Sequence, residues 1–174
     1  MRRFKAGFTL IEVIISLAVV AVLATLVVVV SGKVIEETRR TACLGKLREI
    51  GVALELYLGD NNRIFPDVAF ARSRVEDDTA TLEGALDPYL DDPEAFRCPA
   101  DRELYQSSGS SYFWNSTQSG ARRNQVSFLG MEGRLDRVPL VADKEAFHGE
   151  PEGTNILYAD YRTSNEVSFR AASR

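Results

Sequence analysis

The sequence has few of the residues that most often bind metals. Its 174 residues include one histidine, His148, and two cysteines, Cys43 and Cys98, which lie far apart in the chain. Zinc sites in small domains usually show pairs of cysteine or histidine ligands at short spacing. The sequence therefore gives no support to a zinc site.

Recognisable catalytic motifs are also missing. The chain has no Gly-x-Ser-x-Gly elbow, no phosphate-binding loop and no His-Glu-x-x-His pair. The residues available for an active site would be His148, Asp143, Asp160 and the loop serines Ser107, Ser108 and Ser110. No spacing between them supports a catalytic arrangement. We predict that the protein is not an enzyme.

The chain has no excess of basic residues. It holds 21 lysines and arginines against 25 acids, a formal net charge of -4. Nucleic-acid-binding domains usually carry a basic patch or stripe. Arg122 and Arg123 lie near two aromatic residues, Tyr112 and Trp114, but two arginines are a weak signal in an acidic chain. We expect no nucleic-acid partner.

What the sequence does have is a long, nearly continuous apolar run at residues 8–30, directly after a short basic segment at residues 1–7. As a helix the run would extend roughly 35 Å at about 1.5 Å per residue, longer than the ~30 Å hydrocarbon core of a bilayer. Basic residues beside a membrane helix favour the cytoplasmic side. The pattern predicts a single membrane-spanning helix with the C-terminal part of the chain outside the cytoplasm.

The cleavage pattern differs from that of an ordinary secretory signal. Such a signal has roughly 7 to 15 apolar residues followed by a small-residue cleavage site. Here the plausible cut lies before the apolar run, after Gly7. Cleavage there would remove residues 1–7 as a leader and leave the apolar helix on the mature protein.

Glu12 is the one charged residue within the run at 8–30. A carboxylate at the centre of a membrane helix costs about 2.5 to 3.5 kcal/mol on insertion scales, and such groups usually have a partner or a function. If the chain is cut after Gly7, the new amino group of Phe8 is a positive partner for Glu12, either in the same chain or in a neighbour. A pair with a neighbour would favour one axial register between packed subunits.

Residues 7–12, Gly-Phe-Thr-Leu-Ile-Glu, followed by the apolar run, resemble the prepilin cleavage and methylation motif of type IV pilins and type II secretion pseudopilins. The resemblance implies that a membrane-embedded prepilin peptidase cuts between Gly7 and Phe8 and methylates the amine of Phe8. It also implies that Glu12 takes the charge-pairing role in filament assembly.

An amphipathic segment follows the apolar run. Its apolar residues recur at helical spacing and form one stripe: Cys43, Leu47, Ile50, Leu54 and Tyr57. We expect one long helix over residues 8–58, with a membrane or filament-core part at 8–30 and an amphipathic part at 31–58. The turn-forming residues 59–62 and Pro66 would end it. The segment around the helix end also resembles pseudopilins.

Residues 59–174 are expected to form a globular head. Residues 67–103 look like surface loop with one short helix at 81–89, and β-strands are predicted at 111–115, 125–129, 138–143, 154–160 and 166–170. One sheet face should cover the helix stripe with these residues: Phe113, Val141, Leu157 and Phe169. The predicted fold class is α+β and pilin-like, a long N-terminal helix packed on a small antiparallel sheet.

The C-terminal half resembles a subgroup of secretion-type pseudopilins in segments such as residues 96–101, 138–143 and 155–160. That subgroup usually closes with a hairpin in which aspartate is followed by glycine. Here Asp160 is followed by Tyr161, so we expect a longer loop reaching Glu166 in place of the tight turn.

Two alternatives concern Cys43 and Cys98. An exported head would face an oxidising compartment, where a disulfide between them can persist. Against this, Cys43 lies on the apolar stripe, where buried free thiols are common. The sequence leaves both readings open.

Calcium is the one metal that the sequence keeps as a candidate. Asp143, Asn155, Asp160 and Asp136 are oxygen donors in or beside loops, and the resemblance adds that some secretion pseudopilins bind calcium in their heads. Without an EF-hand spacing we favour solvated turn residues, and so expect no cofactor.

The predicted function is that of a structural filament subunit in a type II secretion-like pseudopilus or a type IV pilus. Its expected partners are other copies, related pilins, prepilin peptidase and an inner-membrane assembly platform. The expected location is the bacterial inner membrane, with a periplasmic or extracellular head. The alternative is a minor tip pilin or adhesin that binds DNA, a surface or a secreted substrate, for which an exposed aromatic or basic patch would be the sign.

Overall fold

The structure, a computed structural model, describes residues 9–149 and 153–165, with the backbone alone for residues 26–31 and 132. The chain divides into two compact units, residues 1–37 and 38–174. Apart from Thr9, the described part of the first unit belongs to a single helix, α1 (Leu10–Asp60), which continues into the second.

The start of α1 carries a helix-capping arrangement. The carbonyl of Thr9 accepts hydrogen bonds from the N–H groups of Glu12 (3.1 Å) and Val13 (3.3 Å). The Thr9 N–H in turn donates to the Glu12 carboxylate at 3.5 Å. This is the acidic half of a capping box, which pairs backbone donors that a helix start would otherwise leave free.

The end of α1 is set by backbone conformation. Asn62 and Arg63 both take positive φ angles, 56° and 61°. The N–H of Arg63 donates to the carbonyl of Leu58 at 2.9 Å, closing the last turn in the manner of a helix C-cap. The helix therefore ends within two residues of the predicted position.

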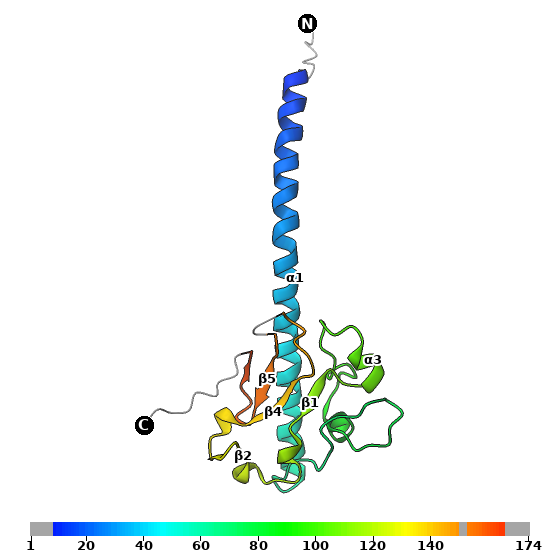
Figure 1. Cartoon of the computed structure of the whole chain (residues 1–174), viewed down its shortest axis with the longest axis vertical. Coiled ribbons are helices and arrows are strands. Elements are labelled where there is room, and N and C mark those ends of the chain that lie inside the picture. The colour runs from blue at the N-terminus through cyan, green and yellow to red at the C-terminus, as the bar shows by residue number, and fades with distance from the viewer. Residues whose placement is uncertain (1–8, 150–152, 166–174) are drawn as a thin grey trace, which may run out of the picture. The chain divides into compact units, whose positions relative to one another are not determined.

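A four-stranded antiparallel sheet lies in the second unit, in the order β1-β4-β5-β6. Its strands are β1 (Tyr112–Trp114), β4 (Pro139–Asp143), β5 (Ile156–Tyr158) and β6 (Thr163–Ser164). A separate hairpin pairs β2 (Ser127–Phe128) with β3 (Met131–Glu132). Figure 1 shows β1, β4 and β5 beside the later turns of α1. The predicted α+β, pilin-like architecture is confirmed.

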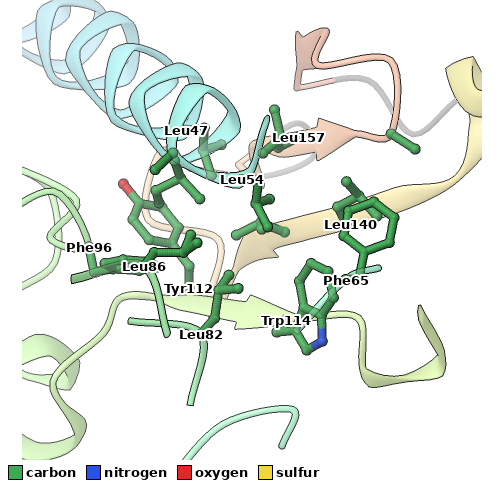
Figure 2. Close-up of a cluster of buried hydrophobic side chains, with 14 of the residues drawn as sticks. Leu47, Leu54, Phe65, Leu82, Leu86, Phe96, Tyr112, Trp114, Leu140 and Leu157 are labelled. Atoms are coloured by element: carbon green, nitrogen blue, oxygen red, sulfur yellow. The ribbon is translucent and has the colours of Figure 1, made fainter. Parts of the chain in front are cut away.

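The core lies between α1 and the sheet. Four of the five predicted stripe residues, Cys43, Leu47, Ile50 and Leu54, are fully buried, Tyr57 is partly buried, and Leu58 completes the stripe. Figure 2 shows Leu47 and Leu54 reaching toward Leu157 of β5 and the aromatic residues of β1. The helical spacing therefore identified the buried face of α1 correctly.

The sheet face was predicted with one error. Val141 and Leu157 are buried as expected, but in β1 the buried residues are Tyr112 and Trp114. Because side chains alternate along a strand, Phe113 lies on the opposite face, where its ring stacks on Phe70 at 4.1 Å between centroids. Phe169 lies outside the described residues, as does the strand predicted at 166–170.

The segment 67–103 is more than surface loop. The expected short helix is present as α2 (Leu82–Leu86) and the 3-10 turn η1 (Asp87–Tyr89). Leu82, Leu86, Phe96 and Cys98 are buried in the core. A further helix, α3 (Leu104–Ser108), was not predicted.

The connection from β5 to β6 is tight, which corrects the expected longer loop. The N–H of Tyr158 donates to the carbonyl of Arg162 at 2.9 Å, and Tyr161 N–H donates to Tyr158 at 2.8 Å. Tyr161 takes a φ of 65°, the left-handed conformation that a glycine would supply in such a turn. A hairpin is kept without the glycine.

Candidate functional site

The N-terminal candidate site is the apolar part of α1. All described side chains from Leu10 to Thr25 are exposed, including Leu10 at 78% and Leu17 at 64%. Glu12 is exposed among them, one turn into the helix. A run of exposed apolar side chains of this kind marks a surface made for lipid or for other chains.

Two predictions about this region fall partly beyond the described residues. Gly7 and Phe8, the predicted processing residues, lie outside them, and so does part of the predicted membrane segment at 8–30. Among the residues that were described, no helix is both long enough and apolar enough to count as a membrane span.

A second candidate site is a buried cluster in the head. Cys43 lies on α1, Cys98 precedes α3, and His148 follows β4. The two sulfur atoms and a ring nitrogen of His148 lie within 4.8 Å of one another. Nε2 of His148 is 3.3 Å from Sγ of Cys98. The fold thus gathers three metal-ligand side chains from three distant segments.

Asp143, the last residue of β4, contacts two members of this cluster. Its Oδ1 lies 3.3 Å from Sγ of Cys43, and its Oδ2 lies 4.0 Å from Nε2 of His148. The side chains of Asp143 and His148 are both fully buried. The N–H of Asn155 donates to Oδ2 of Asp143 at 2.8 Å, which fixes the carboxylate.

Other polar groups support the cluster. The hydroxyl of Tyr112 lies 3.3 Å from Sγ of Cys43. Ser111 Oγ accepts from the N–H of Cys98 at 3.0 Å and donates to Oδ2 of Asp101 at 2.5 Å. The positions of both cysteines are therefore held by hydrogen bonds as well as by packing.

Burial sets the electrostatics of the cluster. Removal from water raises the pKa of Asp143 to about 6, against the opposing effect of the Asn155 N–H. The neighbouring Cys98 thiol and burial raise the pKa of Cys43 far above its ordinary range. Burial also raises the pKa of Tyr112. Cys43 and Tyr112 therefore favour their protonated forms at neutral pH.

Two polar groups beside the cluster are left unpaired. Nδ1 of His148 and both polar atoms of the Asn155 side-chain amide are buried without a hydrogen-bond partner within residues 9–149 and 153–165. Buried polar atoms in folded proteins nearly always have a partner, and the exceptions need an explanation.

The choice between a disulfide and free thiols, which the sequence leaves open, is not tested by the structure. Cys43 and Cys98 are both buried and free in the structure. Their sulfur atoms nevertheless lie within 4.8 Å of each other, so the proximity that the sequence could not guarantee is present.

The calcium candidates occupy different surroundings. Asp143 is buried beside Asn155, whereas Asp160 is exposed in the turn between β5 and β6, where it accepts from the N–H of Arg162 at 3.1 Å. Asp136 is engaged by Arg134 at 3.0 Å. The described residues that do gather as metal ligands are Cys43, Cys98 and His148. Calcium at the oxygen donors, which the sequence analysis did not favour, is not tested by the structure.

The serines named for an enzyme are engaged elsewhere. Ser107 and Ser108 both donate to the carbonyl of Leu104, and Ser110 donates to that of Tyr112. Lys144 donates to Ser108 at 2.7 Å. Within the described part of the chain, none of these serines hydrogen-bonds His148, whose ring faces Cys98.

The residues named for nucleic-acid contact do not form a stacking platform. Tyr112 and Trp114 are buried in the core. Arg122 and Arg123 line an open cavity of about 480 Å³ with Arg63. Arg63 and Arg123 both pair with Glu55, at 2.5 and 2.7 Å, which offsets part of the positive charge.

Sequence reasoning missed the head cluster because it looked for short spacings. The signal that could have found it was chemical, namely the single histidine, both cysteines and a strand-end aspartate, which lie in three separate segments around one core. Only the fold shows that these segments converge.

Comparison with known proteins bears on the N-terminal site. Residues 2–28 match the family described as the prokaryotic N-terminal methylation motif. No curated protein and no solved structure matches the chain. The match covers Gly7, Phe8 and Glu12 and supports a type IV pilin-like or pseudopilin subunit. The N-terminal segment of this chain thus matches the methylation motif that serves as the prepilin cleavage signal of type IV pilins and pseudopilins.

Proposed function

We propose that this protein is a structural subunit of a pilin-like filament, either a type II secretion-like pseudopilus or a type IV pilus, and not an enzyme. The observation that carries the proposal is the methylation motif at residues 2–28. The exposed apolar face of α1 supports it, because such a face needs lipid before assembly and neighbouring helices after it.

The proposed pathway starts in the membrane. Residues 8–30 hold the subunit in the bacterial inner membrane, with the basic residues 1–7 on the cytoplasmic side and the head outside. Prepilin peptidase then cuts between Gly7 and Phe8 and methylates the Phe8 amine. The mature helix leaves the bilayer at the assembly platform and packs against α1 of other subunits.

Glu12 is the proposed determinant of register. In an apolar helix bundle its carboxylate favours a position beside the positive Phe8 amine of a neighbour, because neither charge has water to solvate it. In the free subunit the same carboxylate accepts from Thr9 N–H. Replacing that weak local hydrogen bond by an ion pair with the Phe8 amine of a neighbour would stabilise one axial offset between subunits.

Mass spectrometry of the N-terminus tests the processing step. Protein from native membranes should begin at methylated Phe8 when prepilin peptidase is present and should keep residues 1–7 when it is absent. Retention of residues 1–7 in both samples would contradict the proposal.

A matched set of variants tests the role of Glu12. Glu12→Gln keeps an acceptor for Thr9 N–H and removes the charge, whereas Glu12→Ala removes both. Both variants should insert normally and assemble at least about tenfold less well, the equivalent of ~1.4 kcal/mol. Glu36→Gln, which changes an exposed acid of the same helix beyond the apolar run, should assemble normally. Wild-type filament yield from Glu12→Gln would show that the charge has no role.

A further inference from the structure

We propose that Cys43, Cys98, His148 and Asp143 bind one zinc ion inside the head. This site is separate from the N-terminal helix surface and goes beyond the proposed filament function. Three of the four ligand atoms lie within 4.8 Å of one another, and all four side chains belong to buried residues.

Two of the distances between the proposed ligand atoms match the edge length of a tetrahedron around zinc. Zinc binds sulfur at about 2.3 Å and nitrogen or oxygen at about 2.0 Å, which places neighbouring ligand atoms roughly 3.3 to 3.8 Å apart. The structure has Cys98 Sγ at 3.3 Å from His148 Nε2 and Cys43 Sγ at 3.3 Å from Asp143 Oδ1. The other carboxylate oxygen of Asp143, Oδ2, is 4.0 Å from His148 Nε2, slightly longer than a tetrahedron edge. Small side-chain shifts are enough to close the site around an ion.

Three of the four proposed ligands have outer hydrogen-bond partners, whereas Nδ1 of His148 has none among the described residues. Ligating groups usually hydrogen-bond to outer partners that orient them. Here Asn155 N–H holds Oδ2 of Asp143 and leaves Oδ1 facing Cys43, while the Tyr112 hydroxyl can donate to Cys43 sulfur. Ser111 holds the backbone of Cys98.

The donor set selects zinc among common divalent ions. Two thiolates and an imidazole suit zinc, whereas calcium and magnesium require oxygen ligands. Binding would release the two thiol protons to solvent and leave four protein ligands around the ion. Four protein ligands leave no open coordination position, so the site is structural and would fasten α1 to the loop before α3 and to the segment after β4.

The main competitor is a disulfide between the same two cysteines. A disulfide would use both sulfurs and leave His148 and Asp143 as a buried imidazole and carboxylate without an ion. Zinc uses all four groups together. The zinc-bound state and the disulfide state exclude each other, so an experiment can distinguish them.

The test uses the full chain, purified in detergent without chelators. Elemental analysis should find about one zinc per chain, and thiol-specific labelling after denaturation should find both cysteines reduced. Cobalt exchanged into the wild-type site should give thiolate-to-cobalt charge-transfer absorption and the d–d bands of a tetrahedral ion. These measurements need no variant to fold.

Variants then assign the ligands. Cys98→Ser and His148→Gln should weaken zinc binding by more than about 100-fold, since loss of an outer-shell partner alone costs 10–100-fold, and Tyr112→Phe by about tenfold. Asp160→Asn is the matched control, because it changes an exposed acid of the head and should bind zinc as the wild type does.

Three results would overturn the proposal. One is a zinc-free wild-type chain whose cysteines are oxidised to a disulfide. Another is a zinc-free chain with reduced thiols that also fails to take up cobalt. The third is full zinc affinity in Cys98→Ser, which would place the metal elsewhere. None of them affects the N-terminal processing test, so the two proposals can fail independently.

Discussion

The hydroxyl of Tyr161 donates a 2.6 Å hydrogen bond to Oε2 of Glu55, joining the β5–β6 turn to α1. Arg123 donates to the same oxygen at 2.7 Å, and its guanidinium lies over the Tyr161 ring at 4.7 Å. Burial opposes ionisation of Glu55, but the Tyr161 hydrogen bond and the charges of Arg63 and Arg123 outweigh it and hold the pKa of Glu55 below its ordinary value. Three segments of the head meet at this carboxylate.

Removal of the Tyr161 hydroxyl should weaken this junction. We expect Tyr161→Phe to lower the free energy of unfolding by about 1 kcal/mol, less than a fully buried charged hydrogen bond would cost, because Glu55 is partly exposed. Denaturant unfolding of the full chain measures this loss of stability. Tyr89→Phe is the matched control, since it removes an exposed 3.1 Å hydrogen bond to Asp60 and should cost less than about 0.5 kcal/mol. Equal losses in the two variants would contradict the prediction.

Asp101 should make stability depend on pH in the acid range. Burial opposes its ionisation, but Ser111 and the N–H groups of Glu103, Leu104 and Tyr105 overcome this and lower its pKa. A depressed pKa in the folded state stabilises the fold above the unfolded value, near pH 4, and this stabilisation is lost as pH falls through the folded pKa.

The variant Asp101→Asn should isolate this effect. At pH 7 it should be destabilised by about 1 to 3 kcal/mol, because an amide cannot accept all four hydrogen bonds. The difference from wild type should shrink as the pH falls from about 4 through the lowered pKa of the folded state, because the stabilisation by the ionised carboxylate is lost over that range. Unfolding free energies of the wild type and the variant, measured between pH 7 and pH 3, show whether the difference decreases with falling pH as expected. A difference that stays constant would exclude the carboxylate as its source.

Two glycines of α1 should respond differently to substitution. A Cβ at Gly51 would lie 3.2 Å from a methyl group of Leu157, whereas a Cβ at Gly45 would meet nothing within 4 Å. Gly45→Ala should therefore stabilise the protein by about 0.5 to 1 kcal/mol through helix propensity. Gly51→Val should destabilise it by about 1 to 3 kcal/mol through overpacking against β5. Thermal unfolding compares them, and a stabilised Gly51→Val would refute the close approach of α1 and β5.

The alternation of β1 can be tested with two leucine substitutions. Trp114 is buried and donates through Nε1 to Ser119 at 3.0 Å, whereas Phe113 lies on the other face. Trp114→Leu should lower the free energy of unfolding by about 2 to 4 kcal/mol, and Phe113→Leu by less than about 1 kcal/mol. The reverse order would mean that the strand register is shifted by one residue.

The sequence predicted those parts of the fold that rest on periodicity. The stripe from Cys43 to Leu54 repeats at helical spacing, and a helix that buries it must place these residues on one face. Strand ends came within about two residues for β1, β4 and β5, where turn residues flank short β-forming runs. Both the helical spacing and the turn residues are local signals, and the tertiary structure did not change the elements that they predict.

The errors arose where local pattern did not determine the outcome. Tyr112, Phe113 and Trp114 are all aromatic, so composition could not say which face of β1 is buried. Tyr161 adopts a conformation that tyrosine rarely takes, and its contacts with Glu55 and Arg123 are tertiary. The head cluster likewise depends on how distant segments pack.

The cluster of Cys43, Cys98 and His148 also has a consequence for the order of folding. Its members are separated by long stretches of chain, and contacts across long loops form slowly, because closing each loop costs entropy before the contact is made. The helix that carries Cys43 can form early, but most of the residues that cover its buried stripe lie from Leu82 onward. In a newly synthesised chain the apolar stripe of α1 is therefore exposed until the later segments have been made and have folded onto it. At high local concentrations of nascent chains, this exposed stripe would favour association between helices of different chains.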